Sequence, residues 1–290
     1  MALVGYTPVS RFKRLASRST EMLSFQDLNF DYEPYPIGVV APVLAAESYR
    51  ALVDAFPPLG LFGAKEDLGH KYSLSEVNHG DAYHDYVRAS PPWLDFYRYV
   101  KSPDFIHQTM ASLASSGVDL GLADCRVQSR SRFDGSGKAL AALPGGASRS
   151  LGSAEMSVRR LLTRKAVLGA RFEFSILPGD GGHILPHTDA PQKLVTLVIS
   201  MLGPDEWSDS WGGGTQVLRP KDPAVAFNKM NRYLGFDEVE PVRTLPFRSN
   251  QCVVFVKTFN SLHAVPPVGG GAQVLRRTLT INIERLDTQP

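Results

Sequence analysis

The segment GGHILPHTDAPQKLVTLVISML, residues 181–202, contains a closely spaced pair of residues of types that bind metals in proteins. They are His187 and Asp189, which are separated by one residue. In an extended chain, residues two apart point to the same side, so this imidazole and this carboxylate could hold one cation. Asp is also a common turn residue and His187 follows a proline, so the pair taken alone favours an ordinary turn.

A third candidate, His263, follows the apolar stretch QCVVFVK and precedes Pro266 and Pro267. We expect it at the end of a strand, and the long stretch after Asp189 leaves room for strands that fold back. Two histidines and one carboxylate on one face form the facial triad of non-haem Fe(II) oxygenases, which leaves coordination positions open. Together the three residues predict an iron site.

The segment VLRRTLTINIE, residues 274–284, predicts a strand with one polar face. Alternation places on that face Arg276, Thr278, Thr280, Asn282 and Glu284. An arginine fork matches a carboxylate with two parallel hydrogen bonds, so Arg276 is a candidate anion clamp, and Thr278 could add a hydroxyl donor. Arg277 is the competing candidate, but it shares its face with Leu275 and Leu279.

The segments that must position these residues are predicted to change near residue 166 from mainly helices to mainly strands. Beyond it, ARFEFSIL alternates apolar and polar residues, and four further candidate strands follow, separated by Gly and Pro. This pattern predicts an antiparallel sandwich or barrel, interrupted by a short helical or irregular insertion at 224–236. The first half predicts mainly helices, within 45–58 and 91–117, and strands within 36–44 and 124–133. The Gly- and Ser-rich segment 134–157 predicts a loop.

The composition is that of an ordinary globular protein of 290 residues, with a net charge of +2 and two distant cysteines. The small net charge argues against a nucleic-acid or anionic-membrane partner, and no apolar run approaches the length of a membrane span. The basic N-terminus lacks the apolar stretch of a secretory signal. A reduced, cytoplasmic protein is the simplest expectation.

The order of these motifs resembles that of the Fe(II)- and 2-oxoglutarate-dependent dioxygenases, most closely their prolyl-4-hydroxylase-like branch. The resemblance covers roughly residues 171–285, and the pieces that carry it are PGDGGHILPHTD, LVTLVISML, SDSWGGGTQVLRP, SNQCVVFVKTFNSLHAVPPV and RRTLTINI. No motif of this family is recognised in the first half of the chain.

The resemblance implies a mixed α+β protein with a double-stranded β-helix (jelly roll) core at 166–290. A mainly helical region at 1–165, including the flexible segment 134–157, would pack on this core as part of one structural unit. His187, Asp189 and His263 would hold Fe(II), and Arg276 and Thr278 would bind 2-oxoglutarate. With O2, the enzyme would hydroxylate a C–H bond and release succinate and CO2. The presence of Asp189 favours hydroxylation over halogenation, because halogenating relatives lack this carboxylate.

Several points stay open at this stage. Many relatives carry a tyrosine on the strand before His187 that helps to hold 2-oxoglutarate, whereas FEFSILPG contains none. His183 is expected in a loop or in the substrate pocket, and Trp211 in the core. Arg171 could meet an anionic substrate or belong to a solvated face, and the same holds for Arg126, Arg130 and Arg132. The cluster His79, His84 and Asp85 is expected to be solvated.

The substrate, a small molecule or a peptidyl group, is not specified by these motifs, and neither is the oligomeric state. Two alternatives remain: a metal-dependent cupin-type enzyme that does not use 2-oxoglutarate, and a non-catalytic jelly-roll binding module. The first would not need Arg276, and the second would need neither the metal ligands nor the arginine.

Overall fold

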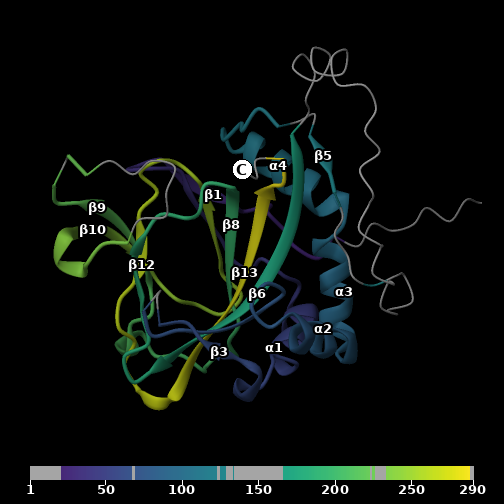
Figure 1. The fold of residues 1–290 in the computed structure, drawn as a ribbon, viewed down its shortest axis with the longest axis horizontal. Coiled ribbons are helices and arrows are strands. Elements are labelled where there is room, and N and C mark those ends of the chain that lie inside the picture. Colours follow the sequence, from purple (N-terminus) through teal and green to yellow (C-terminus); the bar gives the residue numbers. More distant parts are fainter. Residues whose placement is uncertain are drawn as a thin grey trace, which may run out of the picture.

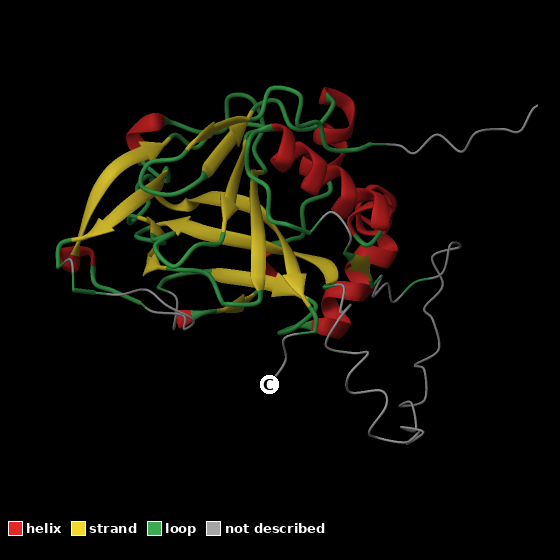
Figure 2. Ribbon diagram, turned by 90° about the horizontal axis from the view of Figure 1, so that it is seen from above, coloured by secondary structure: helices red, strands yellow, loops and turns green. Residues whose placement is uncertain are grey.

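The computed structural model describes residues 21–66, 69–122, 125–128, 133, 166–222, 224–225 and 233–287. Two β-sheets lie face to face, and the helices gather on one side of the strands (Figures 1 and 2). The expected segment 134–157 and most of the insertion at 224–236 lie outside the described residues. No helix of the described part is long and apolar enough to cross a membrane.

The larger sheet has nine strands. They are β1 (Asn29–Asp31), β2 (Ile37–Val40), β3 (Gly63–Ala64), β4 (Tyr72–Ser75), β5 (Arg126–Val127), β6 (Val167–Gly179), β8 (Lys193–Ser200), β11 (Cys252–Val256) and β13 (Gly271–Arg285). Their order is β1-β2-β11-β8-β13-β6-β4-β3, and β5 pairs with β6 in parallel.

The smaller sheet has four strands, in the order β10-β9-β12-β7. They are β7 (Ile184–His187), β9 (Thr215–Pro220), β10 (Val239–Leu245) and β12 (His263–Val265). From β6 to β13 the chain passes repeatedly between the two sheets, with β9 and β10 forming a hairpin in the smaller one. This path is that of a double-stranded β-helix, so the predicted fold class is confirmed. Strand β10 was not predicted.

The helices are α1 (Ala46–Asp54), α2 (Gly80–Ala89), α3 (Pro91–Val100) and α4 (Pro103–Ser115). Proline begins α3 and α4, where its missing N–H costs nothing, and the Ser102 hydroxyl caps α4 by accepting from the Phe105 amide at 3.3 Å. Short 3-10 turns occur at Leu59–Leu61, Asp209–Trp211 and Phe236–Glu238.

The helices cover the outer face of the larger sheet. The ring centroid of Trp93, on α3, lies 4.6 Å from that of Phe174, on β6, and both residues belong to the largest apolar cluster. Because side chains alternate along a strand, Phe172 and Phe174 point to the helices while Glu173 and Ser175 point to the space between the sheets. The alternation read from ARFEFSIL therefore gives β6 one apolar face and one cavity face.

The first half of the chain is less exclusively helical than predicted, because it supplies β1 to β5 to the larger sheet. Of these strands, β2 and β5 fall within the predicted strands at 36–44 and 124–133, and the other three were not predicted. Strand β4 pairs with β6, and β2 pairs with β11. The larger sheet thus combines strands from both sides of residue 166, the expected boundary between the N-terminal region and the core. The division at that residue stays a prediction.

Candidate active site

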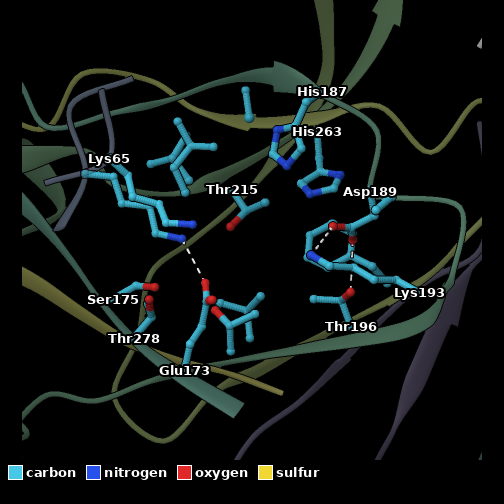
Figure 3. A pocket seen from close by; sticks show the side chains of 18 of the residues that line it. Lys65, Glu173, Ser175, His187, Asp189, Lys193, Thr196, Thr215, His263 and Thr278 are labelled. Carbon is cyan, nitrogen blue, oxygen red and sulfur yellow. Dashed lines mark hydrogen bonds and ion pairs between the residues drawn. The ribbon is translucent and has the colours of Figure 1, made fainter. Parts of the chain in front are cut away.

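Three groups able to bind a metal meet between the two sheets. His187 ends β7 and His263 begins β12, where the two residues are paired across the smaller sheet. Asp189 lies in the link from β7 to β8. One ligand atom from each of the three side chains lies within 4.8 Å of the others, and Figure 3 shows all three side chains directed at the same space.

The two strands on either side of Asp189 belong to different sheets. Strand β7, which ends at His187, is part of the smaller sheet, and β8, which begins at Lys193, is part of the larger one. The site therefore joins both layers of the β-helix. Thr188, between the two candidate ligands, is fully buried.

The two imidazoles are fixed for coordination through Nε2. The Nδ1 atom of His187 lies 2.8 Å from the carbonyl oxygen of Leu185, and Nδ1 of His263 lies 3.0 Å from that of Ser261. A carbonyl only accepts, so each Nδ1 carries the proton and each Nε2 keeps its lone pair. Burial lowers the pKa of His187 to about 3, with His263 adding to the effect, and burial also lowers the pKa of His263. Both rings are neutral at pH 7.

Asp189 is held ionised by its neighbours. Burial alone would raise its pKa, but the positive charge of Lys193 and the hydrogen bond from its ammonium group oppose burial, and the pKa lies well below its usual range. Lys193 Nζ lies 2.8 Å from Oδ1, and the Thr196 hydroxyl donates to Oδ2 at 2.9 Å. Two neutral imidazoles and an ionised carboxylate on one side of a cavity are the donor set that fits Fe(II) with open positions.

Arg276 is a buried cation without an anion. Its side chain lines the same cavity, and the residue is only 3% exposed. Its Nε donates to the carbonyl oxygen of Gly213 at 2.6 Å, and its Cζ lies 4.1 Å from the ring centroid of Phe247. Burial lowers its pKa to about 9, and none of the described acids pairs with it. Arg277 lies on the other face of β13 and pairs with Glu206.

The glycine run in WGGGTQVL makes room for this arginine. Gly213 has a φ of +73°, a region that favours glycine. A Cβ atom at this position would lie 2.7 Å from the Trp207 ring and 3.1 Å from Cδ of Arg276. Trp211 packs against Trp207 at 5.5 Å between ring centroids and is not part of the cavity wall. It is only half-buried, so its expected place in the core stays a prediction.

The residues that line the cavity with Arg276 include Ser175, Thr215 and Thr278, which carry hydroxyl groups. Ser175 and Thr278 face each other across β6 and β13, and the buried Ser175 Oγ has no hydrogen-bond partner among the described residues. Ser175 lies on the strand where relatives carry the tyrosine. The sequence analysis did not single it out, although its alternation with Phe174 and Ile176 already placed it on the polar face.

The cavity has a volume of about 350 Å³, and part of its wall comes from the first half of the chain. Lys65 and Lys71 lie beside β3 and β4, and Lys71 Nζ lies 3.0 Å from Glu173 Oε1. Burial would raise the pKa of Glu173, but the charges of Lys71 and Lys193 outweigh it and lower the pKa to about 2. No motif in the sequence pointed to these lysines.

The remaining candidates lie outside the cavity or are paired. His183 packs against Gly69 and Phe236 and is not part of the wall. Arg171 lines the cavity but forms an ion pair with Glu284 at 2.8 Å. His84 is half-buried on α2, which corrects the expected solvated cluster, and its neighbour Asp85 is exposed. Arg126 is exposed on β5, whereas Arg130 and Arg132 lie outside the described residues.

One family model matches part of this chain. Residues 172–284, which include the three candidate ligands and Arg276, match the family model described as the 2OG-Fe(II) oxygenase superfamily. No curated protein sequence matches the chain significantly.

Similar solved structures include a prolyl-4-hydroxylase from Pseudomonas putida, with 14% identity and a TM-score of 0.40 over 86% of this chain and 92% of that chain. A prolyl hydroxylase from Trichoplax adhaerens, in complex with a peptide fragment of a hypoxia inducible factor, has 12% identity and a TM-score of 0.42 over 87% of each chain. HygX from Streptomyces hygroscopicus, with nickel and 2-oxoglutarate bound, has 9% identity and a TM-score of 0.42 over 87% of this chain and 83% of that chain.

Proposed function

Residues 172–284 form a 2OG-Fe(II) oxygenase domain, and from this premise we propose that the protein hydroxylates a C–H bond of an amino-acid, peptidyl or other organic substrate. In this proposal His187, Asp189 and His263 hold Fe(II), and Arg276 binds 2-oxoglutarate. The observation that carries it is one cavity containing both a three-ligand cluster and a buried arginine that no described acid neutralises. The products are a hydroxylated substrate, succinate and CO2.

The protein's own part in this reaction is to position ligands and substrates. When bound, Fe(II) with 2-oxoglutarate and O2 supplies the oxidising chemistry. His187, Asp189 and His263 would hold the metal, and a set of two histidines and one carboxylate leaves coordination positions open for the co-substrate and oxygen. The histidine rings are hydrogen-bonded to the carbonyl oxygens of Leu185 and Ser261, and Asp189 accepts from the Thr196 hydroxyl. These hydrogen bonds keep the three ligand atoms directed into the cavity.

Arg276 provides the binding energy and the direction for 2-oxoglutarate. A carboxylate at the guanidinium would neutralise a charge that the fold leaves buried and unpaired. Thr278, two residues further along β13, and Ser175, on the neighbouring strand β6, offer hydroxyl donors in the same cavity. We therefore assign to Ser175 the place of the tyrosine that relatives carry. This anchor is the feature that a cupin-type enzyme without 2-oxoglutarate would not need.

The substrate approaches through the wall that the N-terminal region supplies. Lys65, Lys71, Val77 and Asn78 line the cavity and all precede residue 166, which supports a role for this region in shaping the entrance. The net charge of +2 supports a substrate other than nucleic acid. The cytoplasmic location expected from the sequence stays a prediction.

An anaerobic titration tests the proposal. Fe(II)-loaded protein should develop a visible charge-transfer band when 2-oxoglutarate is added. Asp189→Ala should abolish the band and weaken Fe(II) binding. Asp180→Ala, which removes an exposed acid from the same region of the chain, serves as the matched control and should leave both unchanged. If no band develops in the wild type, or if the Asp189 variant keeps its iron affinity, the site is misassigned.

A further inference from the structure

The cavity wall carries five basic side chains, three of which are neutralised by a carboxylate. The pairs are Lys71 with Glu173 at 3.0 Å, Lys193 with Asp189 at 2.8 Å and Arg171 with Glu284 at 2.8 Å. The other two, Lys65 and Arg276, have no acid partner among the described residues. Arg276 is accounted for by 2-oxoglutarate, so Lys65 is the cation that the proposed reaction does not use.

Lys65 is placed to meet a molecule bound in the cavity. It directly follows the edge strand β3, and its backbone N–H donates to the carbonyl oxygen of Lys71 at 2.7 Å, which ties it to β4. The residue is half-buried. Its side chain reaches into the cavity from the side opposite Asp189 and Lys193, with Thr215 between (Figure 3). Its ammonium group and the candidate metal ligands therefore face the same space.

The charge balance of the loaded cavity requires an anion. The dianion of 2-oxoglutarate offsets the two charges of Fe(II), so the metal and the co-substrate together add no net charge. The ion pairs of Lys71, Lys193 and Arg171 are neutral as well. Arg276 and Lys65 therefore leave two positive charges in the loaded cavity. The far carboxylate of 2-oxoglutarate lies at Arg276, so Lys65 is the cation left to meet an anionic substrate.

We propose that Lys65 binds the carboxylate of the substrate, and that the substrate is a small organic acid lying between Lys65 and the metal ligands. This inference rests on the proposed function, because it takes Arg276 as occupied by 2-oxoglutarate. A lysine is a compact point charge that matches one carboxylate. A phosphate dianion would need a second cation, and the neighbouring Lys71 is already engaged by Glu173.

The size of the cavity favours a small acid over a peptide. Its volume of about 350 Å³ is near the lower end of the range for small-molecule sites, roughly 300–1,000 Å³. The co-substrate must occupy part of this volume. A peptide with an acidic side chain is therefore the alternative that the experiment must distinguish.

The test compares the wild type with Lys65→Gln, and uses Lys221→Gln as the matched control. Lys221 is exposed, binds the carbonyl oxygen of Asp237 and is not part of the cavity wall. Each protein is first loaded with Ni(II) in place of iron and titrated with 2-oxoglutarate in a calorimeter. The three affinities should agree. If the wild type does not bind 2-oxoglutarate, the proposed function fails, independently of Lys65.

The loaded proteins are then titrated with the proteinogenic amino acids and with short unbranched carboxylic acids, each beside its carboxamide, and with amidated peptides that contain glutamate. At least one free acid should bind the wild type and the Lys221 variant. Its carboxamide, and the same acid with the Lys65 variant, should each bind at least about tenfold more weakly. The acid that binds should also stimulate succinate formation by the Fe(II) enzyme.

Three outcomes would overturn the proposal. One is that no free acid binds, and another is that acid and carboxamide bind equally. The third is that Lys65→Gln leaves the affinity for the acid unchanged. Binding of the peptides alone would replace the small acid by a peptidyl substrate and would also reject the proposal as stated.

Discussion

Replacing Arg276 by methionine should weaken 2-oxoglutarate binding strongly. The substitution removes the buried charge and keeps most of the side-chain length, so the wall of the cavity stays filled. Truncating one partner of a buried charge pair costs about 2–5 kcal/mol, because the other charge is left buried and unpaired. Even the lower figure raises the dissociation constant by about 30-fold.

The same substitution should stabilise the protein that carries neither metal nor co-substrate. Burial lowers the pKa of Arg276 from 12.5 to about 9, so the fold disfavours the charged form on the order of 5 kcal/mol. Because this is a base with a lowered pKa, the penalty is fully present below pH 9 and disappears only as the pH rises toward 12.5. Loss of the Gly213 hydrogen bond and of the Phe247 contact offsets part of the gain. The urea midpoint at pH 7 should still rise.

The neighbouring arginine provides the matched control. Arg277→Met removes an equal charge one residue away, on the other face of β13, where Glu206 is the partner. An anaerobic titration of the three Fe(II) proteins, followed by the charge-transfer band, gives the 2-oxoglutarate affinities. Urea unfolding of the metal-free proteins gives their stabilities. Equal loss of affinity in both variants, or a loss confined to Arg277→Met, would refute the assignment of Arg276.

Three further substitutions test other parts of the site. Gly213→Ala should lower the free energy of unfolding by roughly 1–3 kcal/mol because of the positive φ at this position, and it should also weaken 2-oxoglutarate binding. The control is Gly60→Ala, whose added Cβ would meet no atom within 4 Å and should change neither stability nor binding. Urea unfolding measures the stability, and the anaerobic titration measures the binding. Thr196→Val removes a hydrogen bond to Asp189 and should lower the affinity for Fe(II) about 10- to 100-fold. Competition with a chelator measures this affinity. An unchanged affinity would mean that the hydrogen bond from Thr196 does not help Asp189 to bind the metal. The pKa of Glu173 is lowered from 4.5 to about 2, so its stabilising effect is present above pH 4.5 and is lost as the pH falls toward 2. In urea titrations Glu173→Gln should therefore be less stable than the wild type at pH 7 and approach it at low pH, and a gap that does not change with pH would contradict this reasoning.

The candidate ligands could be predicted from the sequence because their signals are local. A His-x-Asp pair, a histidine after an apolar strand and an arginine on the polar face of another strand need only alternation and order to be recognised. Alternation also separated Arg276 from Arg277. The pairing of His187 with His263 across the smaller sheet could not be read in this way, because it depends on which strands become neighbours.

The part of the cavity wall that comes from the first half of the chain could not be predicted either, because it also depends on which strands pair. Lys65 and Lys71 are ordinary surface residues in sequence terms, and they reach the cavity only because β4 pairs with β6. The strands β3 and β4 are two and four residues long, too short to show a period. Strand β10 could not be predicted because its apolar and polar residues alternate only weakly. A bulge between Pro241 and Arg243 also interrupts the regular pairing of this strand.

The pairing of β13 determines where this chain can tolerate changes in length during evolution or engineering. Arg276 is opposite Leu177 because of the ladder with β6, whatever its distance along the chain from His263. The ladder is irregular between Gly271 and Leu275, so residues added there or in the preceding loop would bulge outward and leave the cavity intact. One residue inserted after Arg277 would instead turn Arg277 inward and Arg276 outward. We therefore expect this chain to tolerate insertions in the loop before β13 but not within the strand.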